Sequence, residues 1–88
     1  MSIKMSELKE VFELAKEEGS SHVAVEIEMA GFPANEVILN PSENIDSKLA
    51  YYKKTYDENC KHKFADGIRI VNAFHGTYYM GEESEVVN

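Results

Sequence analysis

The chain is poor in the residues that cross-link, kink or anchor small proteins. It has one cysteine, two prolines and no tryptophan among 88 residues. A single cysteine excludes an internal disulfide, so packing alone must hold the fold, as in a reducing compartment. No apolar run approaches the roughly twenty residues of a membrane span, and charged residues interrupt the first thirty positions where a secretory signal would lie. We expect a cytoplasmic protein without membrane contact.

Basic residues are also scarce. Nine lysines and arginines face sixteen aspartates and glutamates, which gives a formal net charge of -7. Most of the imbalance lies in residues 1–50, which hold ten acids against four bases. Such a charge repels nucleic acid and anionic membranes at long range and favours a basic protein partner.

Sequence signatures of catalysis are missing. The five glycines are scattered, and they form no phosphate-binding loop, nucleophile elbow or dinucleotide fingerprint. Cys60 and His62 do not match a zinc spacing, and Lys61 and Lys63 beside them oppose a cation. The remaining soft ligands, His22 and His75, are distant in sequence. We expect no catalytic residue, metal or cofactor, and hence no enzyme.

A helix is predicted from Ser6, which serves as its N-cap, to a stop at Gly19. Its apolar residues recur at three and four positions: Met5, Leu8, Val11, Phe12 and Ala15. Glu10, Glu13 and Glu17 fall on the opposite, solvated face, where Glu13 can pair with Lys16.

Period-two alternation then predicts a strand over residues 22–29. Its inward side carries four apolar residues, Val23, Val25, Ile27 and Met29, and its other side includes Ala24, Glu26 and Glu28. A connection over residues 31–36 leads to a second strand that Pro41 ends, so the pair forms a hairpin. The run "GIRIVNAF" predicts a third strand, and Gly76 turns the chain into a short fourth strand at 77–80.

A second helix is predicted after Ser42, which we assign as its N-cap. Four residues form a stripe within roughly 60 degrees of one another on a helical wheel. They are Ile45, Leu49, Tyr52 and Tyr56. This stripe is the buried face of the helix.

Together these segments predict an α+β fold in one domain, residues 1–80, followed by a loosely held acidic tail, residues 81–88. The order is α-β-β-α-β, with a possible further strand, and the antiparallel sheet order is 2-1-3 with strand 4 at the edge. Both helices cover the face that carries Val23, Val25 and Ile27, and Arg69 lies across from Glu26 or Glu28. Alternatively, the first helix takes the second face and makes a three-layer monomer.

The second sheet face is the candidate contact surface. It would carry Ile38, Val71, Ala73 and Ala24 with Tyr78 or Tyr79, and a homodimer or protein partner would cover it. The acids Glu10, Glu13, Glu17, Glu26 and Glu28 would instead attract a basic partner. A nucleic-acid interface is the runner-up, because Lys48, Tyr51 and Lys54 line up on the second helix.

The run from Glu36 to Gly76, with "NPSEN", "KLAYYKKTY" and "GIRIV", resembles small uncharacterised proteins of phages and prophages of Gram-positive bacteria. The resemblance covers under half of the chain and carries over no site residue. It implies an accessory protein that binds a host or phage protein, sometimes by imitating the charge of DNA. The spread of glutamates along the chain is compatible with such imitation: Glu10, Glu13, Glu17, Glu26, Glu28, Glu82, Glu83 and Glu85.

Overall fold

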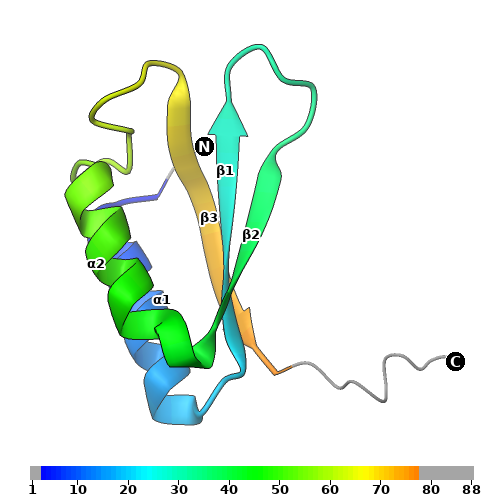
Figure 1. Cartoon of the computed structure of the whole chain (residues 1–88), viewed down its shortest axis with the longest axis vertical. Helices are drawn as coiled ribbons and strands as arrows, with labels where there is room; N and C mark the ends of the chain where they lie inside the picture. The colour runs from blue at the N-terminus through cyan, green and yellow to red at the C-terminus, as the bar shows by residue number, and fades with distance from the viewer. Residues whose placement is uncertain (1–2, 78–88) are drawn as a thin grey trace, which may run out of the picture.

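The computed structural model describes residues 3–77 as two helices packed on a three-stranded sheet (Figure 1). The predicted α+β class and element order are confirmed. In chain order the elements are α1 (Met5–Glu18), β1 (His22–Met29), β2 (Glu36–Pro41), a 3-10 turn η1 (Ser42–Asn44), α2 (Ile45–Thr55) and β3 (Ile68–Gly76). No helix among residues 3–77 is long and apolar enough to cross a membrane.

The sheet is antiparallel with β1 at its centre, in the order β2-β1-β3. The predicted order of these three strands is confirmed. A short hairpin connection makes β2 antiparallel to β1, and the crossover through α2 delivers β3 to the other side of β1. Thr77 belongs to no strand, and the rest of the expected fourth strand and the 81–88 tail lie outside the described residues.

Both helices lie side by side on one face of the sheet, as Figure 1 shows. Leu8 and Phe12 of α1 and Tyr52 of α2 share one buried cluster with Val23 and Val25 of β1. The three-layer alternative, with α1 on the second face, is therefore wrong. The other face of the sheet carries no helix among the described residues.

The helix ends differ in part from the predicted caps. Ser6 lies inside α1, and Lys4 takes the N-cap position, where its backbone N–H donates to Oε1 of Glu7 at 2.7 Å. The predicted stop is confirmed: Gly19 has φ +69, and its N–H reaches the carbonyl of Lys16 at 3.3 Å. Only a residue tolerant of positive φ fits this C-terminal position well.

The start of the second helix is also corrected. Ser42 opens the 3-10 turn and does not cap α2, whose N-cap position falls to Asn44. The side chain of Asn44 makes no cap hydrogen bond; the backbone carbonyl of Asn44 accepts a bond of 3.1 Å from the Ser47 hydroxyl. The buried stripe is confirmed: Ile45, Tyr52 and Tyr56 are at most 4% exposed, and Leu49 is half-buried against the core.

A β-bulge interrupts β3. Glu26 lies opposite Asn72, but Ile27 lies opposite Ile70, so Val71 has no directly opposed residue in β1. An extra residue in one strand exchanges the faces of all residues beyond it. The bulge therefore decides which side chains of β3 point toward the helices.

A short segment of the loop after α2 lines the outer edge of β3. The N–H of Ile70 donates to the Cys60 carbonyl and the N–H of His62 donates to the Ile68 carbonyl, each at 2.9 Å. Cys60 is fully buried with φ +60, an uncommon conformation for a residue with a side chain. Residues 60–62 thus act as a minimal extra strand at the start of β3.

Candidate functional site

The open face is the side of the sheet opposite α1 and α2. Directly opposed residues of antiparallel strands point to the same side, so the register identifies its members. From the three strands they are His22, Ala24, Glu26, Glu28, Val37, Leu39, Pro41, Arg69, Asn72, Phe74 and Gly76.

An apolar patch, made of Val37, Leu39, Phe74 and Ala24, occupies part of this face. Leu39, Ala24 and Phe74 form one row across the three strands. Leu39 is 54% exposed, Phe74 46% and Val37 51%, whereas Ala24 between the two larger side chains is fully buried. Clustered exposed apolar side chains on a small protein are typical of a contact surface, whereas single ones are ordinary.

The remaining charged groups of the open face have partners. Nε of Arg69 lies 2.7 Å from Oε1 of Glu28, which confirms one of the two predicted cross-strand pairs. Glu26 instead accepts a hydrogen bond of 2.8 Å from Nδ2 of Asn35 in the β1–β2 loop. Both sites are partly exposed, so each contributes little to stability. Their effect is that the face presents few unpaired charges.

Two residues expected on this face lie on the helix side. Val25 of β1 lies between Ile38 of β2 and Ala73 of β3, its two directly opposed residues. Both Ile38 and Ala73 pack against the core. Their predicted exposure on the second face is wrong. Val71, also expected there, is half-buried at the bulge.

Sequence reasoning missed Val37, Leu39 and Phe74. Alternation counted from Ile68 and Ile70 predicts that the side chain of Phe74 points toward the helices. The extra residue at the bulge shifts the alternation by one, so Phe74 points to the open face. In β2 every residue from Val37 to Leu39 is apolar, so alternation alone cannot assign faces. The faces of β2 could have been assigned by pairing residues outward from the hairpin turn. That pairing places Ile38 opposite the inward-facing Val25.

The predicted acidic residues do not form one surface. Glu10, Glu13 and Glu17 are exposed on α1, while Glu26 and Glu28 lie on the opposite side of the sheet. The expected pairing of Glu13 with Lys16 is also absent from the described ion pairs. Lys16 instead contacts Asp46 of α2, Nζ to Oδ1, at 2.9 Å.

The residues of the alternative nucleic-acid interface, Lys48, Tyr51 and Lys54, are only partly free to contact a ligand. Tyr51 is 49% exposed and Lys54 is exposed on α2. Nζ of Lys48, however, lies 5.0 Å from the centroid of the Tyr51 ring, and the Tyr51 ring also contacts Tyr52 edge-on with centroids 5.3 Å apart. The lysine and the neighbouring ring therefore occupy surface on which a base would stack.

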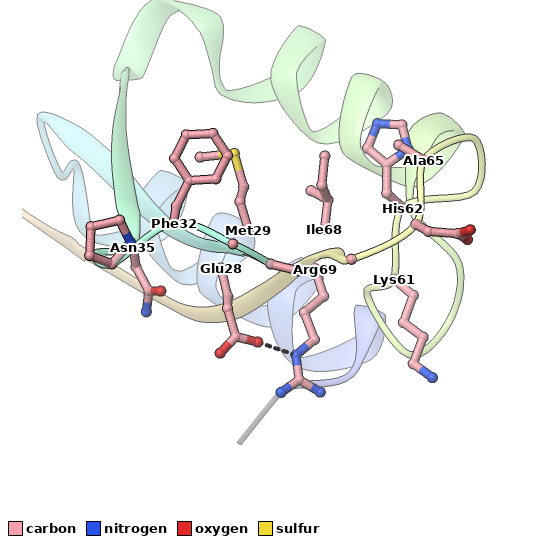
Figure 2. A pocket seen from close by; sticks show the side chains of 14 residues that line it. Glu28, Met29, Phe32, Asn35, Lys61, His62, Ala65, Ile68 and Arg69 are labelled. Atoms are coloured by element: carbon pink, nitrogen blue, oxygen red, sulfur yellow. Dashed lines mark hydrogen bonds and ion pairs between the residues drawn. The ribbon is translucent and has the colours of Figure 1, made fainter.

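A hollow of about 740 Å³ lies at the end of the sheet, between the β1–β2 loop and residues 61–69. Figure 2 shows Met29, Phe32, Ile68 and His62 on one side of the strand ends and Arg69 with charged neighbours on the other. Nδ1 of His62 accepts the N–H of Phe64 at 3.1 Å, a bond that orients the ring within its loop. Of the charged residues that line the hollow, Glu28 and Arg69 are paired with each other.

The loop after α2 uses its polar groups for its own structure. The carboxylate of Asp57 accepts the backbone N–H groups of Lys61 at 3.0 Å and Asn59 at 2.8 Å. These bonds hold the pKa of Asp57 below its ordinary value, and the bond from Lys61 has the larger effect. Within residues 3–77, no three histidine, cysteine, aspartate or glutamate side chains are grouped closely enough to hold a metal ion.

Residues 3–77 form a small α+β fold in which the helices cover one face of the sheet and no described element covers the other. No protein-family model, curated protein or solved structure matches the chain. The resemblance to phage and prophage proteins therefore stays a prediction, and the functional argument rests on this chain's own surfaces.

Proposed function

We propose that this protein is a non-enzymatic interaction module that self-associates through the apolar patch of its open face. One observation carries the proposal: Val37 and Leu39 of β2 and Phe74 of β3 are each about half exposed on the same face, with the buried Ala24 between Leu39 and Phe74. Covering these side chains would remove apolar surface from water, the main favourable contribution to most protein association.

The charge layout favours a second copy of the chain over a basic partner. The exposed acids Glu10, Glu13 and Glu17 lie on α1, on the far side of the molecule from the patch. Two copies that meet at their sheets would keep these acids apart, which limits the repulsion between chains of charge -7. Among residues 3–77, the open face offers a basic partner the acids Glu26 and Glu28, which already have protein partners.

Nucleic-acid binding ranks lower, because Lys48 covers the Tyr51 ring and the net charge opposes the phosphate backbone. A role as a cytoplasmic accessory protein of a phage or prophage is part of our proposal. The resemblance of residues 36–76 supports the phage or prophage context, and the single cysteine supports the reducing compartment.

Light scattering after gel filtration tests the proposal. The wild-type chain is expected to show a mass that rises with concentration toward that of a dimer. Leu39→Lys places a charge in the patch and should shift the protein to monomer, by about tenfold or more in dissociation constant. Leu14→Lys is the matched control, since Leu14 is 37% exposed on α1 and receives the same charge.

The control variant should associate like the wild type. A wild-type chain that stays monomeric at every concentration contradicts the proposal. Equal loss of association in both lysine variants would also contradict it, because a general charge effect would then explain the change.

A further inference from the structure

The two outer edges of the sheet are protected differently. Residues 60–62 line the start of β3 through hydrogen bonds to Ile68 and Ile70. The outer side of β2 has no neighbouring strand among the described residues. Natural proteins protect such edges with lysines, mid-strand prolines or bulges. β2 carries one charged residue, Glu36 at its start, and one proline, Pro41 at its end; residues 37–40 between them contain no charge, no proline and no bulge in the pairing with β1.

The direction of the backbone groups in β2 follows from the ladder. Ala30 donates its N–H to Gly67, so even-numbered residues at that end of β1 face β3 and odd-numbered ones face β2. The odd-numbered residues of β1 lie opposite even-numbered residues of β2, for example Val25 opposite Ile38. These even-numbered residues of β2 therefore point their N–H and C=O groups toward β1. The N–H of Ser42, another even-numbered residue, likewise donates to the Ser21 carbonyl at the start of β1. Val37 and Leu39 therefore present their backbone groups at the outer edge.

We propose that β2 pairs antiparallel with β2 of a second copy, centred on Ile38. This inference depends on the proposed self-association and specifies its junction: Val37 and Leu39 of the apolar patch meet across it, whereas Phe74 on β3 lies away from it. In this register Val37 lies opposite Leu39 of the second copy, and Leu39 opposite its Val37. Each pair exchanges two N–H to C=O bonds, because both residues direct these groups outward. The two sheets then form one antiparallel sheet of six strands.

The side chains of β2 fit this register. Val37 and Leu39 meet on the open face, and Ile38 meets Ile38 on the helix side, so apolar side chains are paired across the junction. Glu36 lies opposite Asn40 of the second copy and not opposite another Glu36. At about 3.3 Å per residue the two Glu36 positions are about 13 Å apart along the strands, beyond the screening length of about 8 Å.

The pairing also joins the apolar patches of the two copies. A two-fold axis perpendicular to the sheet relates antiparallel neighbours, so both open faces stay on the same side. Both sets of helices remain on the other side, with the acids of α1 turned away from the junction. The structure thus assigns a second copy of this chain as the occupant of the β2 edge.

Proline substitution tests the edge directly. Val37→Pro removes an outward N–H and no hydrogen bond within the chain, so the protein should fold but lose self-association by about tenfold or more. Val37→Thr keeps the N–H and is the matched control, with near wild-type association expected. Circular dichroism and the urea midpoint check that each variant is folded.

Amide hydrogen exchange of the wild-type chain provides a measurement that needs no variant. The amides of Val37 and Leu39 should exchange fast in dilute solution and about tenfold or more slowly at concentrations that favour association. The amide of Ile38, which points to β1, should be protected at both concentrations.

The outcomes separate this inference from the proposed function. Slower exchange of Val37 and Leu39 on association, with loss of association in Val37→Pro only, supports edge pairing. Self-association that leaves these two amides fast overturns edge pairing and leaves self-association through the open face standing. A chain that is monomeric at all concentrations overturns both.

Discussion

Three ionisable side chains are buried where α2 meets the loop that follows it. The rings of Tyr52 and Tyr56 lie 6.0 Å apart between centroids, and Cys60 is fully buried. Burial raises the pKa of Tyr56 to about 12 and that of the Cys60 thiol to about 11. Burial also raises the pKa of Tyr52, while its hydrogen bond to Asn40 acts in the opposite direction. These groups bind their protons more tightly in the folded chain than in the unfolded one.

We therefore predict an alkaline loss of stability. The ordinary pKa values are 9.0 for Cys60 and 10.0 for Tyr56, and below them the stabilisation from these bound protons is fully present. It is lost as pH rises through the pKa values of the folded chain, about 11 and about 12. Tyr56→Phe removes one of these groups and should reduce the alkaline loss by about 2 kcal/mol. Urea denaturation at a series of pH values measures the effect.

Tyr51→Phe is the matched control, since it changes an exposed tyrosine of the same helix. Its alkaline loss should resemble that of the wild type. A Tyr56→Phe chain that loses stability as steeply as the wild type would contradict the assignment to Tyr56.

At the scale of elements, two loops meet at one end of the sheet, the upper end in Figure 1. The N–H of Ala30 donates to the carbonyl of Gly67 at 2.8 Å, which connects the β1–β2 loop to the loop before β3. Gly67 has φ +79, and a Cβ atom there would lie 2.8 Å from the Cβ of Ala30. Glycine is therefore needed both for the backbone conformation and for the close approach of the loops.

Gly67→Ala is predicted to destabilise the fold by about 2 to 3 kcal/mol, because it adds a steric clash to the cost of a positive φ. Gly31→Ala is the control: Gly31 has φ +87, but nothing lies within 4 Å of its added Cβ. We expect that change to cost about 1 kcal/mol. Urea midpoints of the two variants measure the difference, and equal costs would show that the contact with Ala30 is not limiting.

At the scale of the whole molecule, the acids of α1 and the apolar patch lie on opposite sides of the sheet. The exposed acids of α1 lie on the helix layer and the apolar patch lies on the open face. A dimer would carry twice the charge of one chain, -7, and so -14 in total. Salt weakens the repulsion between like-charged chains.

Self-association is accordingly predicted to tighten as sodium chloride is raised from low to high concentration. Light scattering or sedimentation equilibrium at matched protein concentrations measures the change. A contact made by the acids with a basic partner would weaken instead. Dissociation of the wild-type dimer by salt would therefore contradict an apolar junction.

Local spacing made much of this fold predictable. The stripe of Leu8, Phe12 and Ala15 predicts the buried side of α1, and Gly19 predicts where the helix ends. Alternation of Val23, Val25 and Ile27 predicts the inward side of β1. Hairpin and crossover geometry then leaves few arrangements of three strands, and the observed order is the predicted one.

The sequence by itself determined the elements, their order and the inward side of β1, because these follow from the fixed spacing of side chains along helices and strands. Only the tertiary structure decided that Ile38 faces inward, that the bulge at Val71 turns Phe74 outward, and that α1 shares a face with α2. These features depend on which distant residues lie opposite one another. Apolar runs such as the one in β2 leave that choice to packing against the rest of the molecule.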